Sequence, residues 1–522
     1  MKKTFCIAGP IQLEDHYFLP FRMNEAELMQ LIDEKKYFIL HAPRQSGKTT
    51  AMRWLATQLN AAAGTYEALY VNVEPAQAMR DDVATALPVI INEIKLAIQE
   101  FFGTQHPMCA FIASKAFLQT PPGSLLSELL QHWSSNNQKP LVLFIDEIDA
   151  LIGDTLISVL RQLRAGYAKR PSHFPQSVCL IGLRDVRDYR IYSKIEGQLV
   201  TGGSAFNVKA ESLTIGNFSR AEVHTLYLQH TAATGQQFTD EAVSYAFEQT
   251  QGQSWLVNAL AYQACFRDML DRSQPITLEV MQRARETLIL RRDTHIDQLL
   301  HKLIEPRVRR IIDPMIAGEE TLDNMEHDDD LQYVCDLGLV TKKDRAIANP
   351  IYQEVILRTL TYQKQQKIQN QPLWYLNADG SLNCTKLMED WVQFYRENSG
   401  IWGEQFAYQE SGPHILMMAY LQRVVNGGGV ITREYALGRR RLDLAILFGA
   451  TQRIVIELKI LRDKTTLPQG LKQTAEYMDT MNATEGHLVI FDPDKNKTKS
   501  WEEKIFQRDE IIENKTIHVW GM

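Results

Sequence analysis

The chain has 522 residues, of which 45% are hydrophobic and 23% are charged, and its formal net charge is -7. This balance excludes a disordered or fibrous protein. It also argues against a uniformly basic nucleic-acid coat, although it is compatible with a local basic face. The length predicts two to four domains.

Cysteine usage and hydropathy indicate the compartment. The six cysteines form no CxxC pair and show no zinc-ligand spacing, which predicts buried, reduced thiols. The segment MKKTFCIAGPIQLEDHYF is a poor signal peptide because its apolar run is short and contains Gly and Pro. No apolar run is long enough to span a bilayer. We therefore expect a cytoplasmic protein with no membrane contact.

Residues 1–208 alternate strand-like and helix-like segments. Apolar runs typical of buried strands are KYFILHA, YEALYVNVE, PLVLFIDEID and SVCLIGL. Helical patterns separate them, beginning with KTTAMRWLATQLNAAAG, which Gly64 ends. Buried strands alternating with helices predict an α/β fold with a parallel sheet covered on both faces.

A phosphate-binding loop lies between the first strand and the first helix. APRQSGKTT matches GxxxxGK[ST] except that Ala42 replaces the first glycine. Gly47 permits a backbone path that points N–H groups at phosphate oxygens, and the following helix adds its positive end. Lys48 would neutralise the β- and γ-phosphates and Thr49 would ligate Mg²⁺. The predicted nucleotide-binding residues are Pro43, Arg44, Gln45, Ser46, Gly47, Lys48, Thr49 and Thr50.

Two acidic residues follow the strand LVLFIDEID, about a hundred residues after the loop. Asp146 would hold Mg²⁺ directly or through water, and Glu147 would orient and activate the attacking water. Taken alone, the pair could be an ordinary helix cap. Together with the phosphate loop, it predicts an ATP-hydrolysing site.

From residue 209 to residue 290 the pattern changes to amphipathic helices with capping residues and glycine stops, which predicts a small helical domain. The motifs APRQSGKTT and FIDEID, followed by such a domain, resemble the AAA-like and STAND-related P-loop ATPases of bacteria. The resemblance implies that 1–208 is the P-loop ATPase core and 209–290 its helical lid. It also implies ATP binding and hydrolysis and possible self-association.

The same resemblance suggests further site residues. Arg184 or Asp185, after the strand SVCLIGL, would sense the γ-phosphate. In the lid segment TQGQSWLVNAL, Gly252 and Trp255 would pack near the nucleotide, unless Trp255 belongs to a plain core. An arginine that reaches a neighbouring subunit could be one of four: Arg161, Arg164, Arg187 and Arg190.

Residues 291–364 read as helices followed by a short hairpin around TKKD, which predicts a winged-helix-like module. Two basic groups in it could contact DNA phosphates. Alternatively, the module packs against the ATPase and its charges are simply solvated. These groups are Arg307, Arg309 and Arg310, then Lys342, Lys343 and Arg345. Residues 365–398 read as a helical connector.

Residues 399–522 contain a second candidate site. RLDLAIL and RIVIELK predict a hairpin of strands, with Asp443 on the first strand and Glu457 and Lys459 on one face of the second. The two carboxylates would bind Mg²⁺ or Mn²⁺, which lowers the pKa of a bound water, and Lys459 would stabilise developing negative charge. The alternative is a surface salt bridge. The next helix supplies Gln473 and Tyr477 on one face.

This order of strands and helix resembles the PD-(D/E)XK nuclease superfamily over roughly residues 400–495, although Leu442 stands where many members have proline. The resemblance implies a C-terminal α/β PD-(D/E)XK nuclease-like domain over 399–522. Several other residues would support such a site: Glu410 or His414 near the metal, and Arg439, Arg440 and Arg441 toward substrate phosphates.

The sequence therefore supports an ATP-dependent or ATP-gated deoxyribonuclease that acts on DNA, in DNA repair or in defence against foreign DNA. A second hypothesis is a nucleotide-switched sensor or scaffold whose C-terminal domain binds nucleic acid or a partner without cleavage. A third and weaker one is a DNA-translocating motor, for which no set of helicase motifs is present.

Overall fold

The computed structural model describes the following residues: 3–19, 23–61, 64–186, 189–193, 198–291, 294–317, 328–365, 375–377, 379–403, 417, 420–421, 429–433, 444–448, 452–461, 463–492 and 500–522. The chain forms two compact units. The first comprises Met1–Arg291 together with Asp336–Gly338, and the second comprises Arg292–Cys335 and Leu339–Met522.

The first unit is built on a five-stranded sheet with the order β2-β3-β4-β1-β7, in which every neighbouring pair is parallel. This confirms the predicted parallel sheet. Because β4 lies between β1 and β3, the phosphate loop after β1 and the acidic residues at the end of β3 both flank the end of β4. The strands are β1 (Tyr37–His41), β2 (Glu67–Asn72), β3 (Leu141–Asp146), β4 (Ser177–Gly182) and β7 (Lys209–Thr214).

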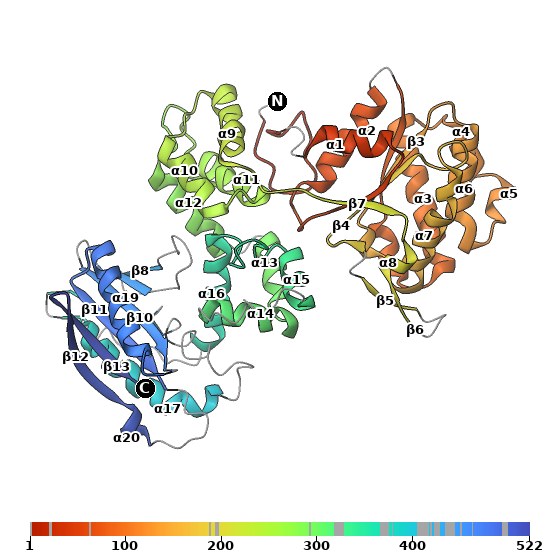
Figure 1. Ribbon diagram of the computed structural model, residues 1–522. Helices are drawn as coiled ribbons and strands as arrows, with labels where there is room; N and C mark the ends of the chain where they lie inside the picture. The colour runs from red at the N-terminus through yellow and green to blue at the C-terminus, as the bar shows by residue number, and fades with distance from the viewer. Residues whose placement is uncertain are drawn as a thin grey trace. The chain divides into compact units, whose positions relative to one another are not determined.

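Helices cover both faces of this sheet (Figure 1). On one face, α1 (Glu25–Asp33) and α2 (Lys48–Ala61) pack against alternate strand residues such as Phe38 and Phe144. On the other face lie α3 (Val83–Phe102), α6 (Leu125–Asn136) and α7 (Gly153–Gly166). Shorter elements join them: η1 (Glu74–Met79), α4 (Pro107–Ile112), α5 (Lys115–Leu118), η2 (Pro122–Ser124), η3 (Ile148–Ala150), η4 (Tyr167–Lys169), β5 (Arg190–Ser193), β6 (Gln198–Thr201) and α8 (Gly202–Ala205).

Helices follow β7. The predicted boundary at residue 209 is too early, because β7 belongs to the parallel sheet, and the lid role of the helices stays a prediction. The helices are α9 (Arg220–Thr234), α10 (Asp240–Thr250), α11 (Ser254–Gln263), the π-helical turn η6 (Ala264–Asp268) and α12 (Leu278–Arg291). Ser219 and Glu222 form a capping box at the start of α9. The N-terminal segment packs on these helices through a hydrogen bond between the Tyr17 hydroxyl and His230.

The second unit begins with helices α13 (Thr294–Lys302), α14 (Pro306–Ala317), α15 (Asp329–Asp336) and α16 (Pro350–Gln365). The hairpin predicted around TKKD is reduced to a single antiparallel bridge between Val340 and Ile347. The short segment between α15 and α16 accounts for this, since it gives the two sides of the turn little length to pair. The winged-helix assignment therefore stays a prediction.

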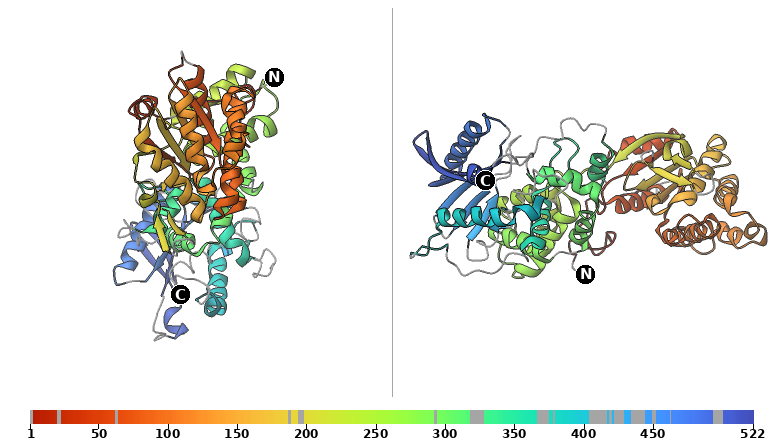
Figure 2. Two further views of the ribbon diagram at one scale, coloured as in Figure 1. Left: turned by 90° about the vertical axis from the view of Figure 1, so that its right-hand side faces the viewer. Right: turned by 90° about the horizontal axis from the view of Figure 1, so that it is seen from below.

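A six-stranded mixed sheet follows, with the order β12-β13-β11-β10-β9-β8. Helix α19 (Thr466–Met481) packs across β10 and β11 and buries an apolar cluster (Figure 2). Strands β9 and β10 are antiparallel, as the hairpin reading predicted. The remaining elements are α17 (Cys384–Gly403), β8 (Gly429–Arg433), β9 (Leu444–Phe448), β10 (Gln452–Ile460), β11 (Glu485–Phe491), α20 (Trp501–Lys504), β12 (Phe506–Ile512) and β13 (Lys515–Gly521).

Among the helices that the structure describes, none has the length and apolar character needed to cross a membrane.

Candidate functional site

The phosphate loop connects β1 to the first turn of α2. Gln45 and Gly47 have backbone φ angles of 55° and 92°, so the loop turns twice through the left-handed region. Such turns make a concave row of backbone N–H groups, which is suited to an anion. Ala42 has no positive φ and is buried, and its N–H donates to the Gly182 carbonyl oxygen at 3.3 Å. A glycine is therefore not needed at position 42.

Lys48 is folded back onto its own loop. Its Nζ donates to the carbonyl oxygens of Ala42 at 2.7 Å and of Pro43 at 3.0 Å. Burial lowers the pKa of this ammonium group, against the raising effect of the nearby carboxylates of Asp146 and Glu147. The ammonium group lies within the loop, where it can turn from carbonyl oxygens to phosphate oxygens.

Thr49, in the first turn of α2, contacts Asp146 at the end of β3. The Thr49 hydroxyl donates to Asp146 Oδ2 at 2.6 Å, and the backbone N–H of Glu147 donates to Asp146 Oδ1 at 2.8 Å. The Asp146 side chain is fully buried. A hydroxyl oxygen and a carboxylate are ligands that Mg²⁺ prefers. The pair therefore fits a Mg²⁺ ion held with a nucleotide.

Sequence reasoning missed Tyr70, which also contacts this carboxylate. The Tyr70 hydroxyl of β2 donates to Asp146 Oδ2 at 2.6 Å. Tyr70 pairs in register with Phe144, two residues before Asp146, so both side chains face α2. The sequence shows only that Tyr70 lies in a predicted strand. Its contact with Asp146 could not be predicted, because it depends on the pairing of β2 with β3.

Glu147 follows in an unusual backbone conformation, with a φ of 57°. Burial, and then the charges of Asp146 and Asp149, raise the pKa of its carboxyl group to about 7, while Lys48 acts in the opposite direction. A carboxyl group with a pKa near 7 is suited to accept a proton near neutral pH. The role of Glu147 in activating water stays a prediction.

The two predicted sensor candidates differ in their surroundings. Asp185 is buried and paired with Lys209 of β7, at 2.6 Å. Arg184 is largely buried and its Nε donates to Asp336 Oδ2 at 2.9 Å, within the first unit. Since Asp185 already has an ammonium partner and is itself an anion, Arg184 is the better candidate to contact a γ-phosphate.

Asp149, which follows β3, contacts the residues that follow β4. Its Oδ1 accepts a hydrogen bond from the Leu183 backbone N–H at 3.0 Å, just after β4. An added Cβ at Gly182 would lie 2.8 Å from this carboxylate oxygen. The end of β4 is thereby held against the residues that follow β3.

Of the four arginines that could reach a neighbouring subunit, the structure describes the side chains of two. Arg161 and Arg164 are exposed on α7, and Arg164 donates to the Ser204 carbonyl oxygen at 2.9 Å. Arg187 and the side chain of Arg190 lie outside the described residues. Solvent exposure is compatible with a contact to another subunit but does not select one of them.

The lid contacts the phosphate loop directly. At the start of α11, the Ser254 hydroxyl donates to the Ser46 carbonyl oxygen at 3.3 Å. Trp255 is buried, and its indole N–H donates to the Ile7 carbonyl oxygen at 2.8 Å. Gly252 has a φ of 71°, and a Cβ there would lie 1.9 Å from the Phe218 carbonyl oxygen. The turn before α11 therefore requires glycine.

Between the N-terminal segment and α2 lies a hollow of about 490 Å³. Thr50, Arg53 and Trp54 line it on the side of the helix. The Ile11 backbone N–H, which also borders it, donates to the Thr50 hydroxyl at 3.4 Å. The hollow thus begins one residue beyond the Lys48–Thr49 pair.

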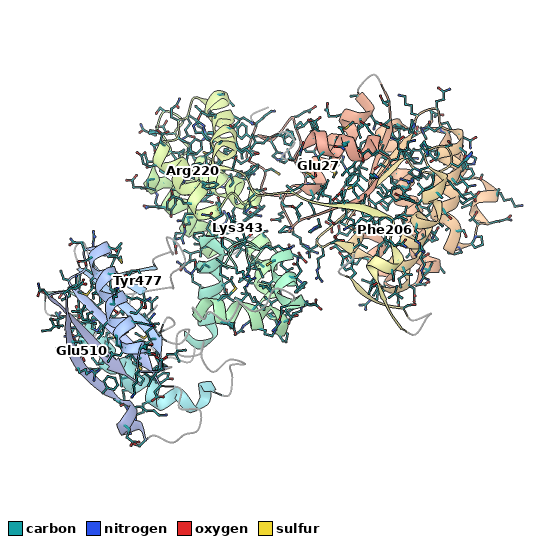
Figure 3. The ribbon with its side chains drawn as sticks, viewed as in Figure 1. Glu27, Phe206, Arg220, Lys343, Tyr477 and Glu510 are labelled. Atoms are coloured by element: carbon teal, nitrogen blue, oxygen red, sulfur yellow. The ribbon has the colours of Figure 1, made fainter. Side chains whose placement is uncertain are left out.

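The basic groups of the second unit are mostly paired. Arg309 makes two hydrogen bonds of 2.6 Å to Asp313, and Arg310 and Arg307 form ion pairs with Asp330. Contacts with DNA phosphates would have to replace these pairs. In the turn after α15, Lys342 and Lys343 are exposed and Arg345 is half-buried (Figure 3).

Of the second predicted site, the structure describes the residues on β10, Glu457 and Lys459, but not Asp443. Glu457 and Lys459 lie on one face of β10, with Glu457 Oε1 2.5 Å from Lys459 Nζ. They are 1% and 8% exposed, so the pair is a salt bridge, as the alternative expected, but a buried one and not one at the surface. Asp443 lies outside the described residues, as do Glu410, His414, Arg439, Arg440, Arg441 and Leu442. The predicted convergence of Asp443 on Glu457 thus stays a prediction.

Helix α19 passes beside this pair. A Cβ on Gly470 would lie 3.3 Å from Lys459 Cγ, which places the first turns of α19 against β10. Gln473 follows one turn later, and its amide oxygen is buried without a hydrogen-bond partner among the described residues. Tyr477 packs partly against the apolar cluster under α19 (Figure 3). Both residues lie on α19, as predicted.

In the described part of the chain, one group combines metal-ligand types: Cys384, Glu485 and His487, with ligand atoms within 4.8 Å of one another. The Trp520 indole N–H donates to His487 Nδ1 at 3.0 Å, and Nε2 lies 3.0 Å from Glu485 Oε1. An indole can only donate, so Nε2 carries the ring proton and donates to Glu485. Both ring nitrogens of His487 are therefore engaged in hydrogen bonds, one with Trp520 and one with Glu485.

Two family models match parts of the chain. Residues 32–189 match the family model described as AAA domain, and residues 382–495 match a domain of unknown function, DUF8371. The second match assigns no activity. Among curated proteins, no match to this chain is found.

Similar solved structures have low identity and low TM-scores. They include the Walker-type ATPase PABY2304 of Pyrococcus abyssi, at 14% identity over 67% of this chain and 99% of that one, with a TM-score of 0.45. The ORC2 protein of Aeropyrum pernix matches at 16% over 66% and 96%, with a TM-score of 0.41. The RuvB Holliday junction branch migration motor of Thermotoga maritima matches at 13% over 67% and 96%, with a TM-score of 0.32.

The family match over 32–189, the parallel sheet and the geometry around Lys48 and Asp146 agree with one another. The first unit therefore resembles an AAA-like P-loop ATPase over residues 32–189, and residues 382–495 of the same chain match a domain of unknown function.

Proposed function

We propose that the first unit binds ATP with Mg²⁺ and hydrolyses it. The contact between the Thr49 hydroxyl and Asp146 supports this most directly, because it assembles oxygen ligands beside the phosphate loop. Lys48 would neutralise the β- and γ-phosphates, Glu147 would accept a proton from water, and Arg184 would contact the γ-phosphate. The hollow beside Thr50 has the size of a small-molecule pocket and would take the nucleoside.

Nucleotide binding and turnover test this proposal in the purified full chain. Lys48→Ala should weaken ATP binding and abolish Mg²⁺-dependent phosphate release. Lys115→Ala removes an exposed lysine of α5 and is the matched control, which should behave as wild type. If Lys48→Ala hydrolyses ATP at the wild-type rate, the phosphate loop is not the site of hydrolysis.

For the second unit we propose a metal-dependent deoxyribonuclease, with DNA as the partner. The supporting observation is the buried Glu457–Lys459 pair on a sheet covered by α19. A buried ion pair is costly and often marks a site whose charge has a use. Asp443 is bonded to Leu444, which pairs in register with Ile456, the neighbour of Glu457. In this proposal Asp443 and Glu457 hold Mg²⁺ or Mn²⁺, and Lys459 stabilises the negative charge that develops during cleavage.

Cleavage of linear, circular and single-stranded DNA, with and without Mg²⁺ and Mn²⁺, tests this second activity. Glu457→Gln and Asp443→Asn should abolish metal-dependent cleavage. Glu513→Gln, an exposed position in the turn between β12 and β13, should leave cleavage unchanged. Equal cleavage by wild type and both site variants would exclude the proposed site.

A second candidate, a nucleotide-switched sensor or scaffold, is favoured by one observation. Within the first unit, Arg184 is paired with Asp336, and a Cβ on Gly338 would lie 2.7 Å from the Pro43 side chain. Residues 336–338 therefore contact both the phosphate loop and the sensor candidate. A γ-phosphate that attracts Arg184 would compete with Asp336 for it.

The preference for ATP over ADP tests this switch. Asp336→Asn removes the competing charge and should raise the ATP preference by roughly tenfold, since an ion pair to a buried arginine is lost. Arg184→Ala should lower it. Asp330→Asn, which affects only the ion pairs of α14 with α15, is the control. An unchanged ATP-to-ADP ratio in Asp336→Asn would rule out the competition.

A further inference from the structure

Tyr70 contacts Asp146, a residue of the proposed Mg²⁺ site. The residue is 5% exposed, and its ring belongs to the apolar cluster between the sheet and α2. The guanidinium carbon of Arg53, on α2, lies 5.5 Å from the ring centroid. The ring is thus held between a strand and a helix, and its hydroxyl meets Asp146 at the end of the next strand.

Two hydroxyl groups from different elements converge on one oxygen of this carboxylate. Thr49 of α2 and Tyr70 of β2 both donate to Asp146 Oδ2, each at 2.6 Å. The other oxygen accepts the Glu147 backbone N–H at 2.8 Å. A fully buried carboxylate needs such donors, and donors from three directions also fix its rotation.

The orientation of Asp146 decides where Thr49 can bind a cation. A threonine hydroxyl has one hydrogen and two lone pairs. Because the hydrogen of Thr49 is given to Asp146, its lone pairs are turned away from that carboxylate and are available for a metal ion. A rotation of Asp146 would turn the Thr49 hydroxyl with it.

We propose that Tyr70 is a positioning residue of the ATPase site, which holds Asp146 so that Thr49 presents its oxygen to Mg²⁺. The inference rests on the proposed binding of ATP with Mg²⁺. Tyr70 touches neither nucleotide nor metal in this scheme and acts through Asp146. A purely structural role would be to fill space and satisfy a buried carboxylate, without an effect on the metal.

The test compares nucleotide binding in EDTA with binding across a Mg²⁺ titration, using a fluorescent ATP analogue and the full chain. Tyr70→Phe keeps the ring and removes the donor. Its binding in EDTA should match wild type, and the half-saturating Mg²⁺ concentration should rise about tenfold, as expected for one hydrogen bond to a charged group. Tyr66→Phe removes a hydroxyl that bonds Asp33 instead, and should leave the titration unchanged.

Two further variants at position 70 keep the test decisive. Tyr70→4-aminophenylalanine restores a donor and should restore the Mg²⁺ dependence. Tyr70→4-methylphenylalanine fills the volume of the hydroxyl without donating, so it should reproduce the defect even if Tyr70→Phe folds poorly. The proposal is overturned if the Mg²⁺ curves of donor-free variants overlie that of wild type, or if binding weakens equally in EDTA. A wild-type chain with no Mg²⁺ dependence would refute the proposed function instead.

Discussion

Glu147 combines a left-handed backbone conformation with a carboxyl pKa raised to about 7. A base must be unprotonated to act, so kcat/KM for ATP should rise with pH and level off above about 7. Glu147→Gln should lower kcat by about a hundredfold or more while ATP still binds. Steady-state kinetics across pH check both effects, with Glu128→Gln on the exposed face of α6 as the control. A wild-type profile that is flat through neutral pH would contradict the assignment.

Lys459 gives a second prediction about a single residue. Lys459→Ala leaves the buried Glu457 carboxylate without its ammonium partner, and should lower the free energy of unfolding by about 3 kcal/mol. The double variant Glu457→Gln with Lys459→Met removes both charges and should recover most of this loss. Urea denaturation measures both. A single variant that is as stable as wild type would show that the pair is well solvated.

The site residues that belong to a sequence motif could be predicted from the sequence. The residues that contact them in the fold could not. The spacing of Lys48, Thr49, Asp146 and Glu147 follows from a loop and a strand end, each readable locally. Tyr70 reaches Asp146 only because β2 lies beside β3 in one particular register. Asp185 was named a sensor candidate because it follows the strand SVCLIGL. Its ion pair with Lys209 could not be foreseen, because Lys209 lies on β7, which was not predicted as a strand from the sequence.

At the scale of elements, the turn before α11 is the most constrained. Gly252→Ala would push a Cβ against the Phe218 carbonyl oxygen and should lower the free energy of unfolding by about 2 kcal/mol or more. Gly235 also has a positive φ, 81°, but nothing lies within 4 Å of its added Cβ. Gly235→Ala should therefore cost only about 1 kcal/mol of backbone strain. Thermal unfolding compares the two, and equal losses would show that the close approach is unimportant.

Strands in long apolar segments were predicted correctly from the sequence, whereas strands in short polar segments were not. Strands such as Leu141–Asp146 are buried at every position and apolar up to the terminal Asp146, as expected for a sheet buried on both faces. The hairpin predicted around TKKD is one bridge, because a few residues on each side cannot sustain a ladder. The β9–β10 hairpin was predictable, since both strands are apolar and five residues or longer.

At the scale of the whole molecule, the two compact units predict separate responses to ligand. ATP with Mg²⁺ at a hundred times its Kd should stabilise the first unit by about 2.7 kcal/mol. Hydrogen exchange would locate this protection in the sheet and lid of residues 1–291. Lys48→Ala should remove it, and protection confined to the second unit would place the nucleotide elsewhere.

The sequence predicts an ATP-gated deoxyribonuclease, and we propose on that basis that the nucleotide state of the first unit controls cleavage by the second. The most direct measurement is the rate of DNA cleavage by the full chain without nucleotide, with ATP, with ADP and with a non-hydrolysable ATP analogue. We predict that the wild-type rate depends on the nucleotide, that Glu147→Gln loses the difference between ATP and the analogue, and that Glu457→Gln cleaves with none of them. A wild-type cleavage rate that is the same in all four conditions would contradict the claim.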